Sequence, residues 1–280
     1  MPTKDELAMN EGSAVRSETT EAQADPATLD PATLDPATLD PATLMNDVPH
    51  LSEDDLRICR SRAQQLLAER ASQADIAVVT EQLGRYPRGI ISVAARCQQC
   101  GTPLVVATRP LITERVKHPT PFPTTFYLTS PEAVKAASHL ESAGVMVELQ
   151  ELYGEEAIAG EAAAAKASGA AASDAVETAD SGEAQGDNLE RHRQYVRAHE
   201  MYLAVRNELA RELGDSQEHI LNISAGGMPT RVKCLHALVG HALAMGPGVN
   251  PVGDEALRRM KHEFDPAVCR CTLKVADFER

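Results

Sequence analysis

Four tandem copies of Asp-Pro-Ala-Thr-Leu run from Asp25 to Leu44 and keep this part of the chain out of any packed core. A proline every fifth residue removes a backbone hydrogen-bond donor and disfavours helix at the residue before it. A repeat this short is also too small to be a packing unit. We therefore expect residues 1–50 to form a disordered acidic tail that contains an extended, solvated spacer.

A second low-complexity segment, residues 154–187, is rich in Ala, Gly, Ser and Glu and predicts a disordered acidic insert. Residues 1–50 carry a net charge of −8 and residues 151–190 one of −9, whereas the whole chain carries −14. The remainder is therefore mildly basic, at about +3, and its local field admits a small anionic ligand. Nucleic acid is a disfavoured partner, because the chain has no Trp, 3% aromatic residues and no dense Lys/Arg stripe.

The apolar pattern predicts a cytoplasmic protein with no membrane contact. The N-terminal residues lack the apolar region of a signal peptide, and the longest apolar run, Ala237–Met245, is short and interrupted by Gly240 and His241. The six cysteines are then better interpreted as thiols or metal ligands than as a disulfide framework.

Outside the two low-complexity segments, the residue pattern predicts a single, mainly helical α+β domain with a small β-sheet of about three strands. This domain comprises residues 51–153 and 188–264, and a C-terminal tail, 265–280, follows it. Ser52 is an expected N-cap and Gly84 an expected helix end. The predicted strands are 90–97, 104–108 and 124–129. A helical pattern runs from Leu51, and a second helix follows Ser130. Further helices are predicted over 73–83, 145–153 and 188–213.

Four segments of this domain have distinctive sequences, and they are Leu83–Gly89, Thr120–Thr124, Arg197–Leu203 and Ser224–Leu257. In these segments the chain resembles the actinobacterial domain of unknown function 501 family, over about residues 73–153 and 189–260. The family has no established activity, so the resemblance implies no catalytic residue. It does imply neighbouring genes for a septum-formation initiator and an exopolyphosphatase, and hence phosphorylated ligands or division-related partners.

Cys97-Gln-Gln-Cys100-Gly101 lies between the first two predicted strands and has the form of a zinc knuckle. Two thiolates on a tight turn converge at metal distance, and Gly101 lets the backbone fold beneath them. One knuckle supplies half a site, and free thiols or a redox pair on the hairpin are the alternatives. The candidates for completing it are Cys234, His236, His241, Cys269 and Cys271, of which the last two otherwise form a flexible pair of thiols.

Helical geometry narrows this choice, because Cys234, His236 and His241 are expected on one helix. On that helix Cys234 and His236 lie about 160° apart and cannot share an ion unless the first turn unwinds. Cys234 and His241 lie on one side but about 10.5 Å apart along the axis. The preferred zinc ligands are therefore Cys97, Cys100 and Cys234, with a tail cysteine, another histidine or water as the fourth.

A candidate anion site precedes and opens the same helix. Gly226 and Gly227 reach positive φ without a steric cost, so their N–H groups can point into one concavity beside Ser224. The following Pro-Thr pair is expected to start the helix, which places Arg231 and Lys233 in its first turn. The alternative is a tight turn, a helix start and two solvated cations. A phosphate or carboxylate is the ligand that suits this arrangement.

His199, Arg206 and His241 are the candidate catalytic side chains. His199 and Arg206 interrupt an apolar helical stripe and, with Lys233 and His241, could line a polar pocket. Alternatively, His241 is hydrogen-bonded within the fold and Arg206 pairs with Glu200 or another carboxylate. No hydrolase or metalloprotease motif supports an enzyme class. Two functions therefore remain, which are binding of a small phosphorylated or anionic ligand and a non-catalytic, zinc-stabilised interaction module with division-related partners as one option.

Overall fold

The computed structural model describes residues 51–155, 157 and 181–279. The predicted N-terminal tail, its repeats and most of the predicted insert lie outside these residues. The long helix begins at Ser181, so it is longer than the predicted span that starts near Asn188. Within the part of the chain that is described, no helix is both long and apolar enough to cross a membrane.

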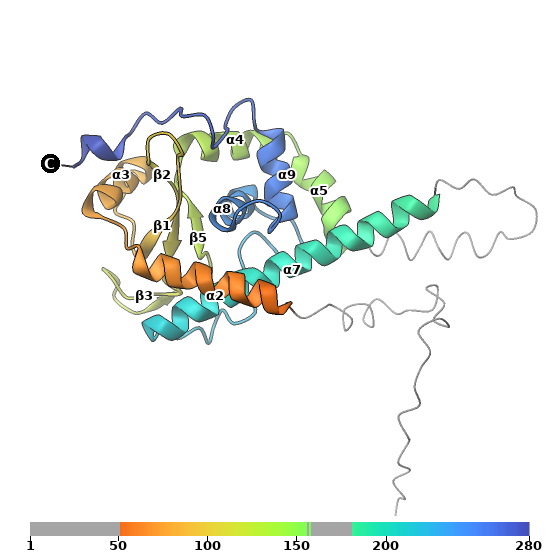
Figure 1. Cartoon of the computed structure of the whole chain (residues 1–280), viewed down its shortest axis with the longest axis horizontal. Helices are drawn as coiled ribbons and strands as arrows, with labels where there is room; N and C mark the ends of the chain where they lie inside the picture. The colour runs from red at the N-terminus through yellow and green to blue at the C-terminus, as the bar shows by residue number, and fades with distance from the viewer. Residues whose placement is uncertain (1–50, 156, 158–180, 280) are drawn as a thin grey trace, which may run out of the picture. The chain divides into compact units, whose positions relative to one another are not determined.

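The described residues form the predicted α+β fold (Figure 1). A three-stranded antiparallel sheet has the order β1 (Ile90–Arg96), β2 (Pro103–Thr108) and β5 (Phe126–Leu128). A small two-stranded sheet joins β3 (Leu111–Ile112) to β4 (Thr120–Pro121). The helices are α2 (Glu53–Ala68), α3 (Gln73–Leu83), α4 (Pro131–Ser142), α5 (Val145–Tyr153), α7 (Ser181–Leu213), α8 (Leu235–Met245) and α9 (Pro251–Arg259), and a 3-10 turn, η2, covers Val275–Asp277.

Local capping explains why several helices begin and end where the sequence predicts. The Ser52 hydroxyl accepts the N–H of Asp55 at 3.1 Å, and the Asp55 carboxylate accepts the N–H of Ser52 in return. Ser130 caps α4 and is followed by proline at the first helical position. Gly84 ends α3 in the left-handed conformation, with φ of 63°. These residues confirm the predicted boundaries.

Helix α8 lies at the centre of the domain and packs against β5, α9 and α4 (Figure 1). Gly240 allows this close approach, because a Cβ at this position would lie 2.9 Å from the carbonyl oxygen of Phe126. Leu235, Leu238 and Val239 are fully buried, and so is His241 on another face of the helix. Because most of this helix is buried, a polar residue such as His241 must find its partners inside the fold.

The segment before α8 differs from its predicted conformation. Helix α8 begins at Leu235 and not at the Pro-Thr pair, because the preceding chain closes on itself. The N–H of Arg231 donates to the Gly227 carbonyl at 2.9 Å, and the N–H of Lys233 donates to the Gly226 carbonyl at 2.7 Å. Cys234 is extended at the N-cap, with φ of −155°. These turn hydrogen bonds therefore use N–H and carbonyl groups that would otherwise have formed the bonds of a longer helix.

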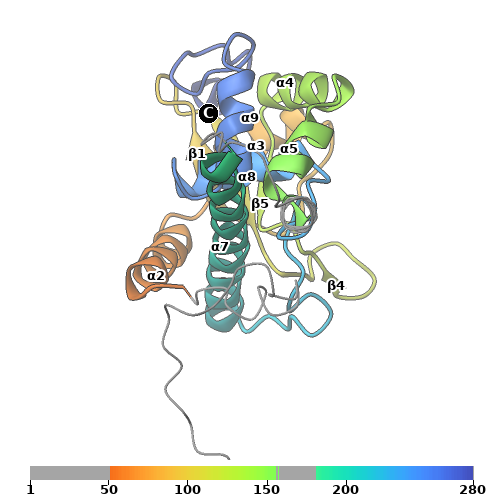
Figure 2. The same ribbon diagram turned by 90° about the vertical axis from the view of Figure 1, so that its right-hand side faces the viewer.

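The C-terminal segment is packed on the domain and is not a free tail. The Gln99 side-chain amide donates to the carbonyl of Ala267 at 2.8 Å, and the Thr102 hydroxyl donates to that of Leu273 at 2.9 Å. The 3-10 turn η2 contacts α3. Figures 1 and 2 show this segment running across the end of the molecule that carries the β1–β2 turn, with α2 and α7 lying side by side below it.

Candidate metal centre

Four cysteines converge at the turn between β1 and β2. Cys97 and Cys100 come from the turn, and Cys269 and Cys271 come from the C-terminal segment. Their sulfur atoms all lie within 4.8 Å of one another, and the Cys269 and Cys100 sulfurs are 3.4 Å apart. The turn is shaped by the N–H of Cys97, which donates to the Thr102 carbonyl at 2.9 Å.

The arrangement of the sulfurs suits a tetrahedral metal ion. Zinc–sulfur bonds of about 2.3 Å place the sulfurs of a tetrahedral site about 3.8 Å apart. The Cys100–Cys269 separation of 3.4 Å is far longer than a disulfide bond of about 2.05 Å, and all six cysteines are free. Cys97 is buried, whereas the other three sulfurs are half-buried. The four cysteines can therefore hold a metal ion, and zinc is the ion that such a set prefers.

The thiols differ in how readily they ionise. Burial opposes ionisation of Cys100, but hydrogen bonds with Thr102, Cys269 and Cys97 lower its pKa to about 6. Burial raises the pKa of Cys271, and its hydrogen bonds with Cys100 and Cys97 act in the same direction. Cys100 is thus the thiol of the cluster that ionises most readily, and the neighbouring thiols stabilise its thiolate by hydrogen bonds. A bound cation would displace those remaining protons.

The geometry agrees with the predicted knuckle but does not bring the predicted third ligand to it. The structure brings Cys97 and Cys100 together as expected, but the C-terminal segment supplies their partners and Cys234 does not. Cys234 lies instead beside His236 and Glu141, with its sulfur 3.8 Å from Nδ1 of His236. The helical argument that separated Cys234 from His236 fails, because Cys234 precedes the helix.

The C-terminal cysteines were among the candidate ligands, but the sequence did not show that two of them join the knuckle. The Cys-x-Cys pair at Cys269 and Cys271 completes the ligand count of a Cys-x-x-Cys knuckle, and four thiolates form a closed zinc site. The alternative prediction for the pair was two flexible thiols, and the structure instead places both beside the knuckle. The Cys100–Cys269 contact spans 169 positions along the chain. Only the fold brings residues so distant together.

The predicted anion loop uses its glycines for packing. A Cβ on Gly227, whose φ is 93°, would lie 2.5 Å from the carbonyl oxygen of Arg231. Ser224 is buried, and its hydroxyl lies 2.9 Å from Nδ1 of His199. Arg231 and Lys233 are both exposed. The loop therefore presents two cations at the surface, while the serine belongs to an interior contact.

Arg206 has a structural role that its sequence position did not reveal. Its side chain is fully buried, and its Nη2 donates to the Ile220 carbonyl at 2.5 Å and to the Leu221 carbonyl at 3.0 Å. Its other donors bond to the Ile223 carbonyl and, at 3.0 Å, to the Gln217 side chain. Three of these four acceptors are carbonyls of the loop that follows α7. Arg206 satisfies the backbone of the loop that follows α7.

His241 is enclosed by aromatic rings. It stacks on Phe126 with the ring centroids 5.6 Å apart, and its edge contact with Tyr202 is 5.1 Å. Its Nδ1 lies 3.0 Å from the amide nitrogen of Asn250, whereas its Nε2 has no hydrogen-bond partner among the described residues. Burial lowers the pKa of His241 to about 3, and burial with the nearby Arg206 charge lowers that of His199 to about 4. Both imidazoles are therefore neutral at pH 7.

These two histidines predict how stability depends on pH. The unfolded chain binds their protons below a pKa of about 6.5, whereas the folded chain does not until pH 4 or lower. The free energy of unfolding is thus expected to fall as the pH decreases from 6.5, by up to about 1.4 kcal/mol per pH unit for each histidine. Urea unfolding at pH 7, 6 and 5 measures this slope. His199→Gln should give a shallower slope, and an unchanged one would contradict the assignment.

The fold and the cysteine cluster together define an α+β protein with a candidate structural metal centre. The family model described as Protein of unknown function (DUF501) matches residues 93–186 and 175–258, which together are more than half of the chain, and the chain belongs to this family. The match includes Cys97, Cys100 and Cys234 and ends before Cys269 and Cys271. Comparisons with curated proteins and with solved structures each find no match.

Proposed function

We propose that this chain is an interaction module that holds one structural zinc ion through its cysteine cluster. The observation that carries this proposal is the convergence of four sulfurs, on Cys97, Cys100, Cys269 and Cys271, within 4.8 Å of one another. A site with four protein ligands leaves no open position for a reacting water or substrate, which is the usual form of a structural zinc site.

The position of the cluster supports a structural role. The C-terminal segment has little apolar surface buried, and Val268 is 48% exposed. Its hydrogen bonds to Gln99 and Thr102 are individually worth about 1 kcal/mol. A zinc ion bonded to both Cys269 and Cys271 would fasten this segment to the hairpin far more strongly. The surface that the segment and the hairpin form together would then be presented as one rigid unit.

Native mass spectrometry of the full chain as purified tests the zinc proposal. We expect one zinc ion per chain, and replacement by Co²⁺ should give the intense thiolate charge-transfer absorption of a four-sulfur site. A chain that carries no metal and takes up none when zinc is added would overturn the proposal. So would a mass that shows the four cysteines joined in disulfides.

Binding of a small anionic ligand is a second candidate function, and the exposed cations beside the glycine loop favour it. Among the residues that the structure describes, neither Arg231 nor Lys233 has a carboxylate partner. A Cβ on Gly227 would lie 2.9 Å from the Lys233 side chain, so the lysine leaves the loop directly beside the glycine pair. A phosphate or carboxylate could bind both cations at this point.

A thermal-shift measurement with inorganic phosphate and pyrophosphate tests this second function. An anion present at about 100 times its Kd adds about 2.7 kcal/mol to the free energy of unfolding, so the melting temperature should rise. Lys233→Ala is expected to abolish the rise. Lys261→Ala removes another exposed cation of α9's C-terminal flank and serves as the matched control. Equal shifts in both variants would show that the anion acts elsewhere.

A further inference from the structure

The N-terminus of α8 opens onto a cavity of about 590 Å³ that the zinc proposal does not use. Cys234 and His236 line it from the start of α8, and Val134 and Lys135 line it from α4. Most of the remaining wall comes from β5 and its flanks, which are Thr124 and Phe126 to Thr129. A nucleophilic and a basic side chain thus face one mainly apolar hollow.

The backbone places the Cys234 sulfur favourably for ionisation. Cys234 is the N-cap of α8, so its side chain lies at the end of the helix where backbone N–H groups are unpaired and the dipole is positive. The sulfur is 3.8 Å from Nδ1 of His236. A thiolate at a helix N-terminus beside a histidine is the usual environment of a reactive cysteine.

The hydrogen bonds of His236 show which of its ring nitrogens lies toward Cys234. Its Nε2 lies 3.1 Å from the carbonyl oxygen of Val134 and 3.0 Å from the Ser138 hydroxyl. A carbonyl oxygen can only accept, so Nε2 carries a hydrogen and Nδ1 is the nitrogen that exchanges a proton with Cys234. The ring is therefore held with Nδ1, and not Nε2, toward the Cys234 sulfur.

Glu141 of α4 completes the surroundings of this pair. Its Oε1 accepts the N–H of Leu235 at 2.7 Å and lies 3.1 Å from Nδ1 of His236. The hydrogen bond with Cys234, and then the Glu141 carboxylate, raise the pKa of His236 to about 9, although burial opposes the shift. The hydrogen bond with His236 lowers the pKa of Cys234. Among the described residues, Lys135 and Tyr127 are the other titratable groups in the cavity wall.

We infer that Cys234 is the nucleophile of a second site, a catalytic one, in which His236 transfers the proton and the cavity receives an acyl substrate. The Cys234 sulfur attacks the acyl carbonyl carbon, and a sulfur–carbon bond forms as the bond from that carbon to the leaving group breaks. The leaving group takes the proton from Nδ1 of His236. Water then attacks the thioester, Nδ1 takes its proton, and the acid leaves as the Cys234 thiolate is restored.

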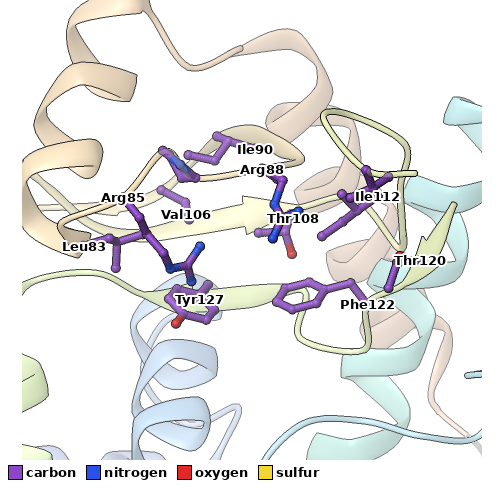
Figure 3. Close-up of a pocket in the computed structure, with 12 residues that line it drawn as sticks. Leu83, Arg85, Arg88, Ile90, Val106, Thr108, Ile112, Thr120, Phe122 and Tyr127 are labelled. Carbon is purple, nitrogen blue, oxygen red and sulfur yellow. The ribbon is translucent and has the colours of Figure 1, made fainter. Parts of the chain in front are cut away.

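A neighbouring hollow indicates the class of substrate. This hollow, of about 290 Å³, shares Leu83 and Tyr127 with the wall of the first cavity, so the two adjoin. Figure 3 shows Arg85 and Arg88 bordering it, with Tyr127 and Phe122 on the opposite side. The pair of hollows therefore fits an acyl group with an apolar body whose far end carries a carboxylate or phosphate.

Alkylation of the full-length, zinc-loaded protein by iodoacetamide, followed cysteine by cysteine with mass spectrometry, tests the nucleophile. At pH 7 Cys234 should react before the buried Cys59, whose pKa burial raises to about 12. His236→Gln should slow the reaction of Cys234 about tenfold or more, because an ordinary thiol is only a few per cent ionised at this pH. Cys269→Ser, which removes a proposed zinc ligand, should leave the rate at Cys234 unchanged.

Two active esters of equal chain length test the substrate class. Mono(4-nitrophenyl) suberate and 4-nitrophenyl octanoate differ in a terminal carboxylate, and we expect a burst of one 4-nitrophenolate per chain, with an acyl adduct on Cys234. The suberate should have the higher kcat/KM, and Arg85→Ala with Arg88→Ala should remove this preference. Absence of an adduct in a folded protein would overturn the inference. Protection of Cys234 by a second equivalent of zinc would also overturn it and assign Cys234, His236 and Glu141 to a metal site.

Discussion

Replacing both Cys269 and Cys271 by serine is expected to abolish zinc binding and to lower the melting temperature by roughly 10 °C. A ligand that binds only the folded state adds about 4 kcal/mol when its free concentration is about 1,000 times its Kd. A domain of 150–250 residues loses about 2–4 °C for each kcal/mol. The loss of zinc and the lower melting temperature have the same cause, because the metal site forms only when the C-terminal segment lies on the hairpin.

The controls for this result are built into the chain. Cys234→Ser changes a half-buried cysteine outside the cluster and should retain one zinc per chain and most of the stability. Cys97→Ser removes a ligand from the hairpin side and should reproduce the loss. Differential scanning fluorimetry with and without a chelator measures these changes. An unchanged melting temperature in the double variant, together with retained zinc, would exclude the cysteine cluster as the metal site.

Replacing Arg206 by alanine is expected to reduce the free energy of unfolding by about 3–5 kcal/mol. The guanidinium is fully buried, and its donors bond to the carbonyls of Ile220, Leu221 and Ile223 and to the Gln217 side chain. Alanine would leave these acceptors without a partner and would add a cavity beside α7. The loop after α7 should consequently lose its order, and Ser224 should lose its contact with His199.

Urea unfolding compared with Arg211→Ala measures this effect. Arg211 lies on the same helix, but its side chain is 65% exposed and pairs with Glu208 at the surface, so its removal should leave the stability almost unchanged. Arg206→Lys keeps a charge and fewer donors and should fall between the two. If Arg206→Ala and Arg211→Ala proved equally mild, the buried hydrogen bonds of Arg206 would not support the loop as described.

Much of the fold could be predicted because its signals are local. A serine that precedes a helical pattern satisfies free N–H groups of the first turn, as Ser52 does with Asp55, so the helix boundary follows from neighbouring residues. Short runs rich in β-branched residues on either side of the knuckle predicted the β1–β2 hairpin. The start of α8 was wrong because backbone bonds within the glycine turns compete with helix there. The residue pattern alone does not show whether the turn hydrogen bonds or the helix will form there.

The sequence by itself determined the knuckle, the two glycines at positive φ and the helix that carries His236 and His241, since each depends on residues within one turn of the chain. Only the tertiary structure decided which residues complete each site. It brought Cys269 to Cys100 and Glu141 to His236, over 169 and 95 positions. It also enclosed Arg206 among loop carbonyls and His241 among aromatic rings. Such contacts depend on how helices and strands pack, and a local pattern of residues does not show which distant residues will meet.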